Sequence, residues 1–268
     1  MRYIFFSFFV LFLIGCGEPE GRLSYFHQPK KITPDDTFYI QLKDDIKNTK
    51  ASIYIIDGFN YSKDDISKLK KAKKLVMCYF SGGILHSDDK DVDSYDEDVK
   101  GKTVSLYDDS RYLDIRANQV LNNMKKRVDF AKSKGCDGVV FADMQNYEED
   151  TGFNISSQNQ IDYNSELAKY LEDESMYRGI RGDENQSKDM WFRYGFIVVD
   201  NAYERNITDK LDYYYNNKKA IFNIETDIKY LTDKEEFKKL CDFSRKNHIK
   251  SVVLSKSLDG SIIKSCDY

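Results

Sequence analysis

The chain has 268 residues, of which 41 are lysine or arginine and 45 are aspartate or glutamate, so its formal net charge is −4. This balance argues against a nucleic-acid partner, because nucleic-acid-binding domains normally carry an excess of positive charge. The hydrophobic content of 41%, with 20 tyrosines and 17 phenylalanines, is ample for the core of one large domain.

The first fifteen residues have the pattern of a signal peptide. Arg2 precedes an almost unbroken apolar run over residues 3–14, and Gly15 and Cys16 follow. As a helix this run spans about 18 Å, which is too short for the ~30 Å hydrocarbon core and disfavours a permanent transmembrane helix. The final Leu-Ile-Gly-Cys has the form of a lipobox, with a small residue before the cysteine. We therefore expect residues 1–15 to be removed and Cys16 to be lipidated, which makes the protein an exported, membrane-anchored lipoprotein of the cell envelope.

The next segment reads as a tether. All three prolines, Pro19, Pro29 and Pro34, lie before residue 35, in a stretch without apolar periodicity. We interpret residues 16–36 as the lipidated cysteine and a flexible tether, and residues 37–268 as a single folded domain.

Short apolar runs and helical stripes then alternate along the domain, as in a parallel α/β protein. Three helices are expected from Asn118 to Gly135, from Ser157, and from Thr232, each with a capping residue at its start. Eight βα-like repeats in one domain favour a closed (β/α)8 barrel of the TIM type. The expected strands cover residues 38–42, 52–57, 75–80, 138–142, 178–181, 196–200, 220–225 and 251–254.

Four cysteines follow Cys16 in the chain. Since exported proteins can form disulfides, we expect Cys241 and Cys266 to tie the last helix to the C-terminal segment. Cys78 lies inside an apolar run and is expected to be a buried thiol. The absence of CxxC and HExxH spacing gives no support for a metal site, and no GxGxxG motif follows a strand, so no cofactor is expected.

Acidic residues stand at the C-terminal ends of several expected strands. In a barrel these ends converge on one mouth, where crowded carboxylates separate into a proton donor and an ionised partner. Such a mouth would attract a cationic amino sugar. The alternative for each single residue is a turn or helix-capping role. The acids are Asp57, Asp143, Asp183, Asp200 and Glu225.

Four short motifs lie along the domain, each occurring once: CYFSGG at 78–83, YLDIR at 112–116, KGCDGV at 134–139 and FNIE at 222–225. They resemble the CYFSAG, WLDIR, KGCDGV and FNAE motifs of glycoside hydrolase family 114, the endo-α-1,4-polygalactosaminidases. The resemblance runs from about residue 38 to the C-terminus. It implies a barrel that cleaves galactosamine-containing polysaccharide with two carboxylates.

The chain departs from the family pattern at both carboxylate positions. Ala142 stands where the family has the catalytic aspartate of its PDN motif, and Asp143 follows one residue later. Successive strand residues point to opposite faces, so this shift requires an irregular strand end. Asp200 stands in place of the glutamate of the family's NEQ motif.

Two functions remain open from the sequence. The first is a hydrolase of α-1,4-linked galactosamine polysaccharide in which Asp143 and Asp200 are catalytic. The second is a polysaccharide-binding barrel that has lost the hydrolase carboxylates. In the first, further residues are expected to bind the substrate: Asp57, Tyr79, Ser81, Arg181, Asp183 and Glu225.

Overall fold

The computed structural model describes residues 31–105 and 109–268, so the expected signal peptide and Cys16 lie outside the described residues. From Ile32 onward the described chain packs against the domain, and the side chain of Ile32 is buried in the core. Within the described residues, no helix is both long and apolar enough to cross a membrane.

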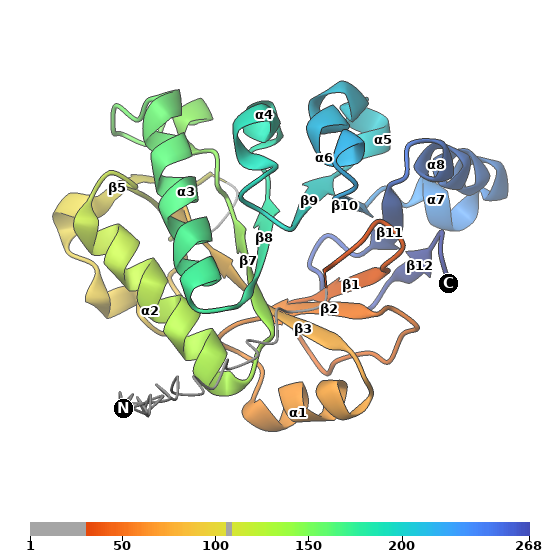
Figure 1. Cartoon of the computed structure of the whole chain (residues 1–268), viewed down its shortest axis with the longest axis horizontal. Helices are drawn as coiled ribbons and strands as arrows, with labels where there is room; N and C mark the ends of the chain where they lie inside the picture. The colour runs from red at the N-terminus through yellow and green to blue at the C-terminus, as the bar shows by residue number, and fades with distance from the viewer. Residues whose placement is uncertain (1–30, 106–108) are drawn as a thin grey trace, which may run out of the picture.

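A curled sheet of nine strands forms the centre of the molecule, and the helices lie around it (Figure 1). Eight strands are parallel and neighbour one another in chain order, whereas the last pairs antiparallel with β11. This arrangement confirms the predicted (β/α)8 barrel. The strands are β1 (Phe38–Gln41), β2 (Ile53–Asp57), β3 (Leu75–Ser81), β7 (Gly138–Ala142), β8 (Tyr177–Arg181), β9 (Phe196–Asp200), β10 (Ala220–Glu225), β11 (Lys250–Leu254) and β12 (Ile263–Ser265).

A hydrogen bond and side-chain packing close the barrel between β1 and the last two parallel strands, β10 and β11. No ladder connects β1 with β11 in the part of the chain that the structure describes, but the Leu42 amide donates to the Leu258 carbonyl at 2.8 Å. The rings of Phe38 and Phe222 stack with their centroids 4.7 Å apart. Burial of such rings from water supplies about 1.5–3 kcal/mol each, which holds the sheet in its curled form.

Eight α-helices and five short 3-10 helices connect the strands in the described chain. The α-helices are α1 (Lys63–Lys71), α2 (Asn118–Lys134), α3 (Ser157–Asp173), α4 (Ser187–Met190), α5 (Ala202–Arg205), α6 (Asp212–Asn216), α7 (Lys229–Thr232) and α8 (Lys234–Lys246). The 3-10 helices are η1 (Val92–Ser94), η2 (Glu97–Val99), η3 (Asn146–Glu148), η4 (Glu184–Gln186) and η5 (Thr208–Leu211).

A small antiparallel sheet, which the sequence did not indicate, stands between β3 and α2. Its strands are β4 (Ile84–Leu85), β5 (Lys100–Thr103) and β6 (Arg111–Leu113), in the order β4-β6-β5. The segment between β4 and β5, residues 86–99, includes η1 and η2 and lies at the barrel mouth. We call this segment the acidic loop.

Two disulfides brace the barrel. Cys241 is bonded to Cys266, the pair expected from the sequence. The expectation of a buried thiol at Cys78 is wrong, because Cys78 is bonded to Cys136 with a Cα separation of 5.9 Å. The physical reason is that β3 and β7 are neighbours, and Cys136 lies just before the start of β7.

Candidate active site

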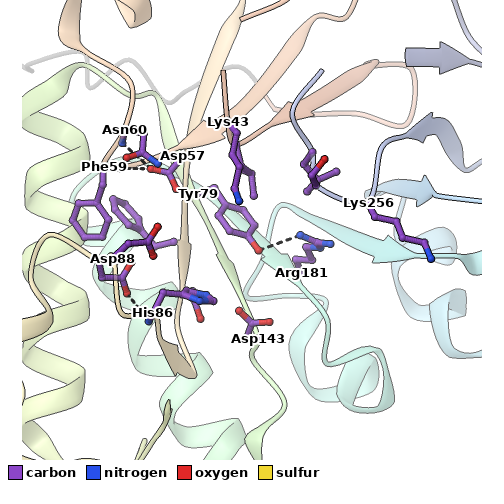
Figure 2. A pocket seen from close by; sticks show the side chains of 16 residues that line it. Lys43, Asp57, Phe59, Asn60, Tyr79, His86, Asp88, Asp143, Arg181 and Lys256 are labelled. Carbon is purple, nitrogen blue, oxygen red and sulfur yellow. Dashed lines mark hydrogen bonds between the residues drawn. The ribbon is translucent and has the colours of Figure 1, made fainter. Parts of the chain in front are cut away.

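A pocket of about 260 Å³ opens at the C-terminal ends of the strands (Figure 2). The ends of β2, β3, β7 and β8 contribute to it, as does the acidic loop that follows β4. Its polar lining combines four aspartates with three basic side chains: Asp57, Asp88, Asp89 and Asp143 with Lys43, Arg181 and Lys256. This is the place where barrel enzymes assemble their active sites.

The pocket brings together five of the residues expected from the sequence. They are Asp57, Tyr79, Ser81, Asp143 and Arg181. Within the described chain, the other three expected residues do not line this pocket: Asp183, Asp200 and Glu225.

Asp143 reaches the pocket because the backbone turns immediately after β7. The strand keeps its pairing as far as Ala142, whose carbonyl accepts from the Gly82 amide at 2.8 Å. Asp143 itself has φ of 56°, in the left-handed region that non-glycine residues seldom adopt. This turn is the irregular strand end that the one-residue shift required, and it places the Asp143 carboxylate in the pocket.

Arg181 connects the pocket with Asp200. Its Nε and Nη2 donate to the two carboxylate oxygens of Asp200 at 2.9 and 2.8 Å, and its Nη1 donates to the Tyr79 hydroxyl at 3.1 Å. Figure 2 shows Tyr79 and Arg181 pointing toward each other. Asp200 is therefore held one side chain away from the pocket that Asp143 lines.

The charges around Arg181 offset its burial. Burial alone would lower the pKa of the Arg181 guanidinium, but Tyr79, Asp200 and Asp143 outweigh it and hold that pKa well above its ordinary value. Asp143 and Asp200, the two carboxylates expected to be catalytic, therefore both favour the charged form of Arg181. Arg181 is thus the electrostatic centre of the site.

Asp57 lies at the end of β2 and closes a tight turn. Its Oδ1 accepts from the amides of Phe59 and Asn60 at 2.8 and 2.7 Å. Burial raises the pKa of the Asp57 carboxyl despite these hydrogen bonds, and the nearby Asp89 raises it further. Asp57 therefore combines a structural role in the turn with a place in the pocket.

Asp183 and Glu225 support the strand ends from within. Asp183 accepts from Asn164 Nδ2 at 2.8 Å, and burial raises the pKa of its carboxyl to about 9. Glu225 is fully buried and accepts from the Tyr203 amide at 3.1 Å, and burial raises the pKa of its carboxyl as well. Glu225 thus holds the backbone at Tyr203 and Asp183 holds the side chain of Asn164, and neither acid lines the pocket.

Several pocket residues were missed by the sequence analysis. His86, Asp88 and Asp89 come from the loop after β4, and Lys43 and Lys256 follow β1 and β11. The density of aspartates in the loop was the available signal for its part of the pocket. Nothing in the sequence distinguished Lys43 or Lys256 from other surface lysines. Across residues 31–105 and 109–268, no group of three or more His, Cys, Asp or Glu side chains is arranged to hold a metal ion.

A parallel barrel with carboxylates gathered at its mouth is the arrangement of many enzymes that cleave glycosidic bonds. Residues 22–268 match the model of glycoside-hydrolase family GH114, and the chain belongs to this family. The resemblance found in the sequence motifs is thereby confirmed.

Two solved structures show the same fold. The chain is similar to Ega3 of Aspergillus fumigatus in complex with galactosamine, with 23% identity, a TM-score of 0.82, and coverage of 91% of this chain and 100% of that chain. It is also similar to the glycoside hydrolase domain of PelA from Pseudomonas aeruginosa, with 13% identity, a TM-score of 0.67, and coverage of 85% and 98%. A comparison with curated proteins finds no match.

Proposed function

We propose that the protein is a glycoside hydrolase that cleaves α-1,4-linked galactosamine-containing polysaccharide, with Asp143 and Asp200 as its working carboxylates. The observation that carries this proposal is that Asp143 lines the strand-end pocket together with Arg181, whose guanidinium donates to both carboxylate oxygens of Asp200. Membership of family GH114 and the galactosamine in the Ega3 complex support the reaction and the sugar.

The geometry suggests different roles for the two carboxylates. Both oxygens of Asp200 already accept from Arg181, so Asp200 is suited to remain an acceptor that stabilises positive charge on the sugar ring. Asp143 lines the open pocket, where a leaving oxygen would lie, and we assign it the role of the acid–base residue. The acids of the pocket, Asp57 and Asp88 among them, would attract the ammonium groups of the polymer.

Release of reducing ends from α-1,4-polygalactosamine tests the proposal. We expect the wild type to cleave the polymer, and Asp143→Asn and Asp200→Asn each to lower the rate by about 10²- to 10⁴-fold. Asp64→Asn, at an exposed position in the first turn of α1, is the matched control and should keep full activity. Cleavage that survives both site substitutions would show that other residues catalyse the reaction.

The second candidate is a barrel that binds the polysaccharide without cutting it. Ala142 at the family's first carboxylate position and the ion pair between Asp200 and Arg181 favour it. Retained binding of polygalactosamine by a wild type that releases no reducing ends would establish this function and rule out the hydrolase.

We also propose that the mature protein begins at Cys16 and is anchored to a membrane surface by lipid on that cysteine. The support is the sequence pattern of residues 1–16. The distribution of a Cys16→Ser variant between membrane and soluble fractions measures this directly.

A further inference from the structure

A second cavity of about 340 Å³ adjoins the candidate active site. Phe59 lines both cavities, and residues of α2 line the second one, so the second cavity lies beside the first on the side of α2. We call it the side groove and define it by Phe59, Lys90, Lys126 and Phe130. Phe59 is thus the residue that the two cavities share.

The side groove has aromatic walls. The rings of Phe59 and Phe130 lie with their centroids 6.0 Å apart, and 39% of Phe130 is exposed. Aromatic rings offer flat apolar surface to a ligand, and cavities of about 300 Å³ or more with mostly apolar lining and a few polar groups are typical of small-ligand sites. The less polar face of a pyranose ring or an acetyl methyl group fits such a surface.

The charge of the side groove is opposite to that of the pocket. Its acidic residue, Asp91, is paired with Arg127, whose Nε and Nη2 donate to it at 2.8 and 2.6 Å. The charges that remain are the amines of Lys90 and Lys126. An ammonium group would be repelled here, whereas the aspartates of the neighbouring pocket attract one.

We propose that the side groove is a subsite for an uncharged, N-acetylated hexosamine unit of the same polysaccharide whose amine-bearing units occupy the acidic pocket. The inference rests on the proposed function for the identity of the polymer. It deepens that function, because the preferred substrate is then a partly acetylated chain cut near a boundary between acetylated and free-amine units.

Comparison of two polymers tests the groove: fully deacetylated polygalactosamine and a partly N-acetylated polymer of equal length. We expect Phe130→Ala to raise the ratio of KM on the partly acetylated polymer to KM on the deacetylated polymer about tenfold, because the apolar wall is lost. Lys126→Glu should shift the ratio in the same direction by creating a charge that attracts free amines. Mass spectra of the wild-type products should show N-acetyl units at a fixed distance from the cut.

Phe192→Ala is the matched control, because Phe192 is also an exposed phenylalanine, 51% exposed, and lies outside the side groove. It should leave the KM ratio unchanged. Thermal unfolding of all three variants separates loss of the groove from loss of the fold. Equal KM ratios for wild type, Phe130→Ala and Lys126→Glu would overturn the proposal.

Direct binding distinguishes failure of this inference from failure of the proposed function. If the wild type cleaves neither polymer, titration with N-acetylgalactosamine oligosaccharides still measures the groove. Binding that weakens about tenfold in Phe130→Ala and stays intact in Phe192→Ala would support the subsite while removing the hydrolase. Absence of binding, or equal binding by wild type and Phe130→Ala, would overturn the subsite.

Discussion

At the scale of single residues, Arg181 fixes the position of Asp200 relative to the pocket. Arg181 ends β8 and Asp200 ends β9, and these strands are paired neighbours. A guanidinium presents two parallel donors to a carboxylate, which a lysine amine cannot do. The side chain of Asp200 is thereby fixed relative to Tyr79 and the pocket, and a shift of about 1 Å in such a group can cost about 10²-fold in rate.

The buried carboxyl group of Asp183 leads to a prediction about how stability depends on pH. Burial raises the pKa of its carboxyl to about 9 from an ordinary value of 3.8, so at neutral pH the folded state holds a proton that the unfolded state releases. Stability should therefore fall as pH rises between those two values, by up to about 1.4 kcal/mol per pH unit. We expect Asp183→Asn, which is neutral at every pH, to flatten this part of the curve. Urea unfolding at pH 5, 7 and 8.5 measures the effect.

Asp64 supplies the control for this experiment. Asp64 is exposed on α1 and is not among the charges that act on Asp183, so Asp64→Asn should keep the pH dependence of the wild type. If wild type and Asp183→Asn lose stability in parallel as pH rises, Asp183 is ionised in the folded protein and its burial is compensated in another way.

At the scale of elements, Arg127 of α2 holds the acidic loop against the barrel. Only 1% of its side chain is exposed, and it pairs with Asp89 and Asp91 while donating to the Ser81 carbonyl at 3.0 Å. We expect Arg127→Lys to destabilise the protein by about 1–3 kcal/mol, because the lysine amine cannot satisfy three acceptors in this geometry. Urea unfolding measures the loss, and hydrogen exchange over residues 86–99 should show a loosened loop.

Arg116→Lys is the matched comparison for the loop. Arg116 also pairs with an aspartate, Asp114, but 39% of its side chain is exposed, and exposed pairs contribute about 0–1 kcal/mol. Equal stability and equal exchange in the two variants would show that the loop is held by its own turns and not by Arg127.

The elements that the sequence predicted are those with a strong apolar pattern. Most of the eight parallel strands are buried runs such as Phe196–Asp200, whereas β8, with the sequence YRGIR, is only partly buried. The small sheet was missed because Lys100–Thr103 contains no apolar side chain to mark it as a strand. Helix starts moved by one residue where a neighbour capped better: Asp233 accepts from two amides at the start of α8, where Thr232 was expected.

At the scale of the whole molecule, the site depends on contacts between distant segments. The acids at the strand ends were visible in the sequence, because a barrel must gather its strand ends at one mouth. Two features depend on side-chain directions in neighbouring strands. They are the ion pair between Arg181 and Asp200 and the disulfide between Cys78 and Cys136, which are 58 residues apart. Local patterns in the sequence do not contain that information.

The proposed membrane anchor concerns the whole molecule, because it would determine where the pocket meets its substrate. Two or three acyl chains on Cys16 would hold the protein far more firmly than a single chain, and the residues between Cys16 and Lys31 could span at most about 50 Å. We expect Cys16→Ser to move the protein from the membrane fraction to the soluble fraction, as measured by fractionation and by loss of the lipid mass. Gly17→Ala, which keeps the thiol, should stay in the membrane fraction. A Cys16→Ser protein that remains there would show that the attachment does not depend on this cysteine.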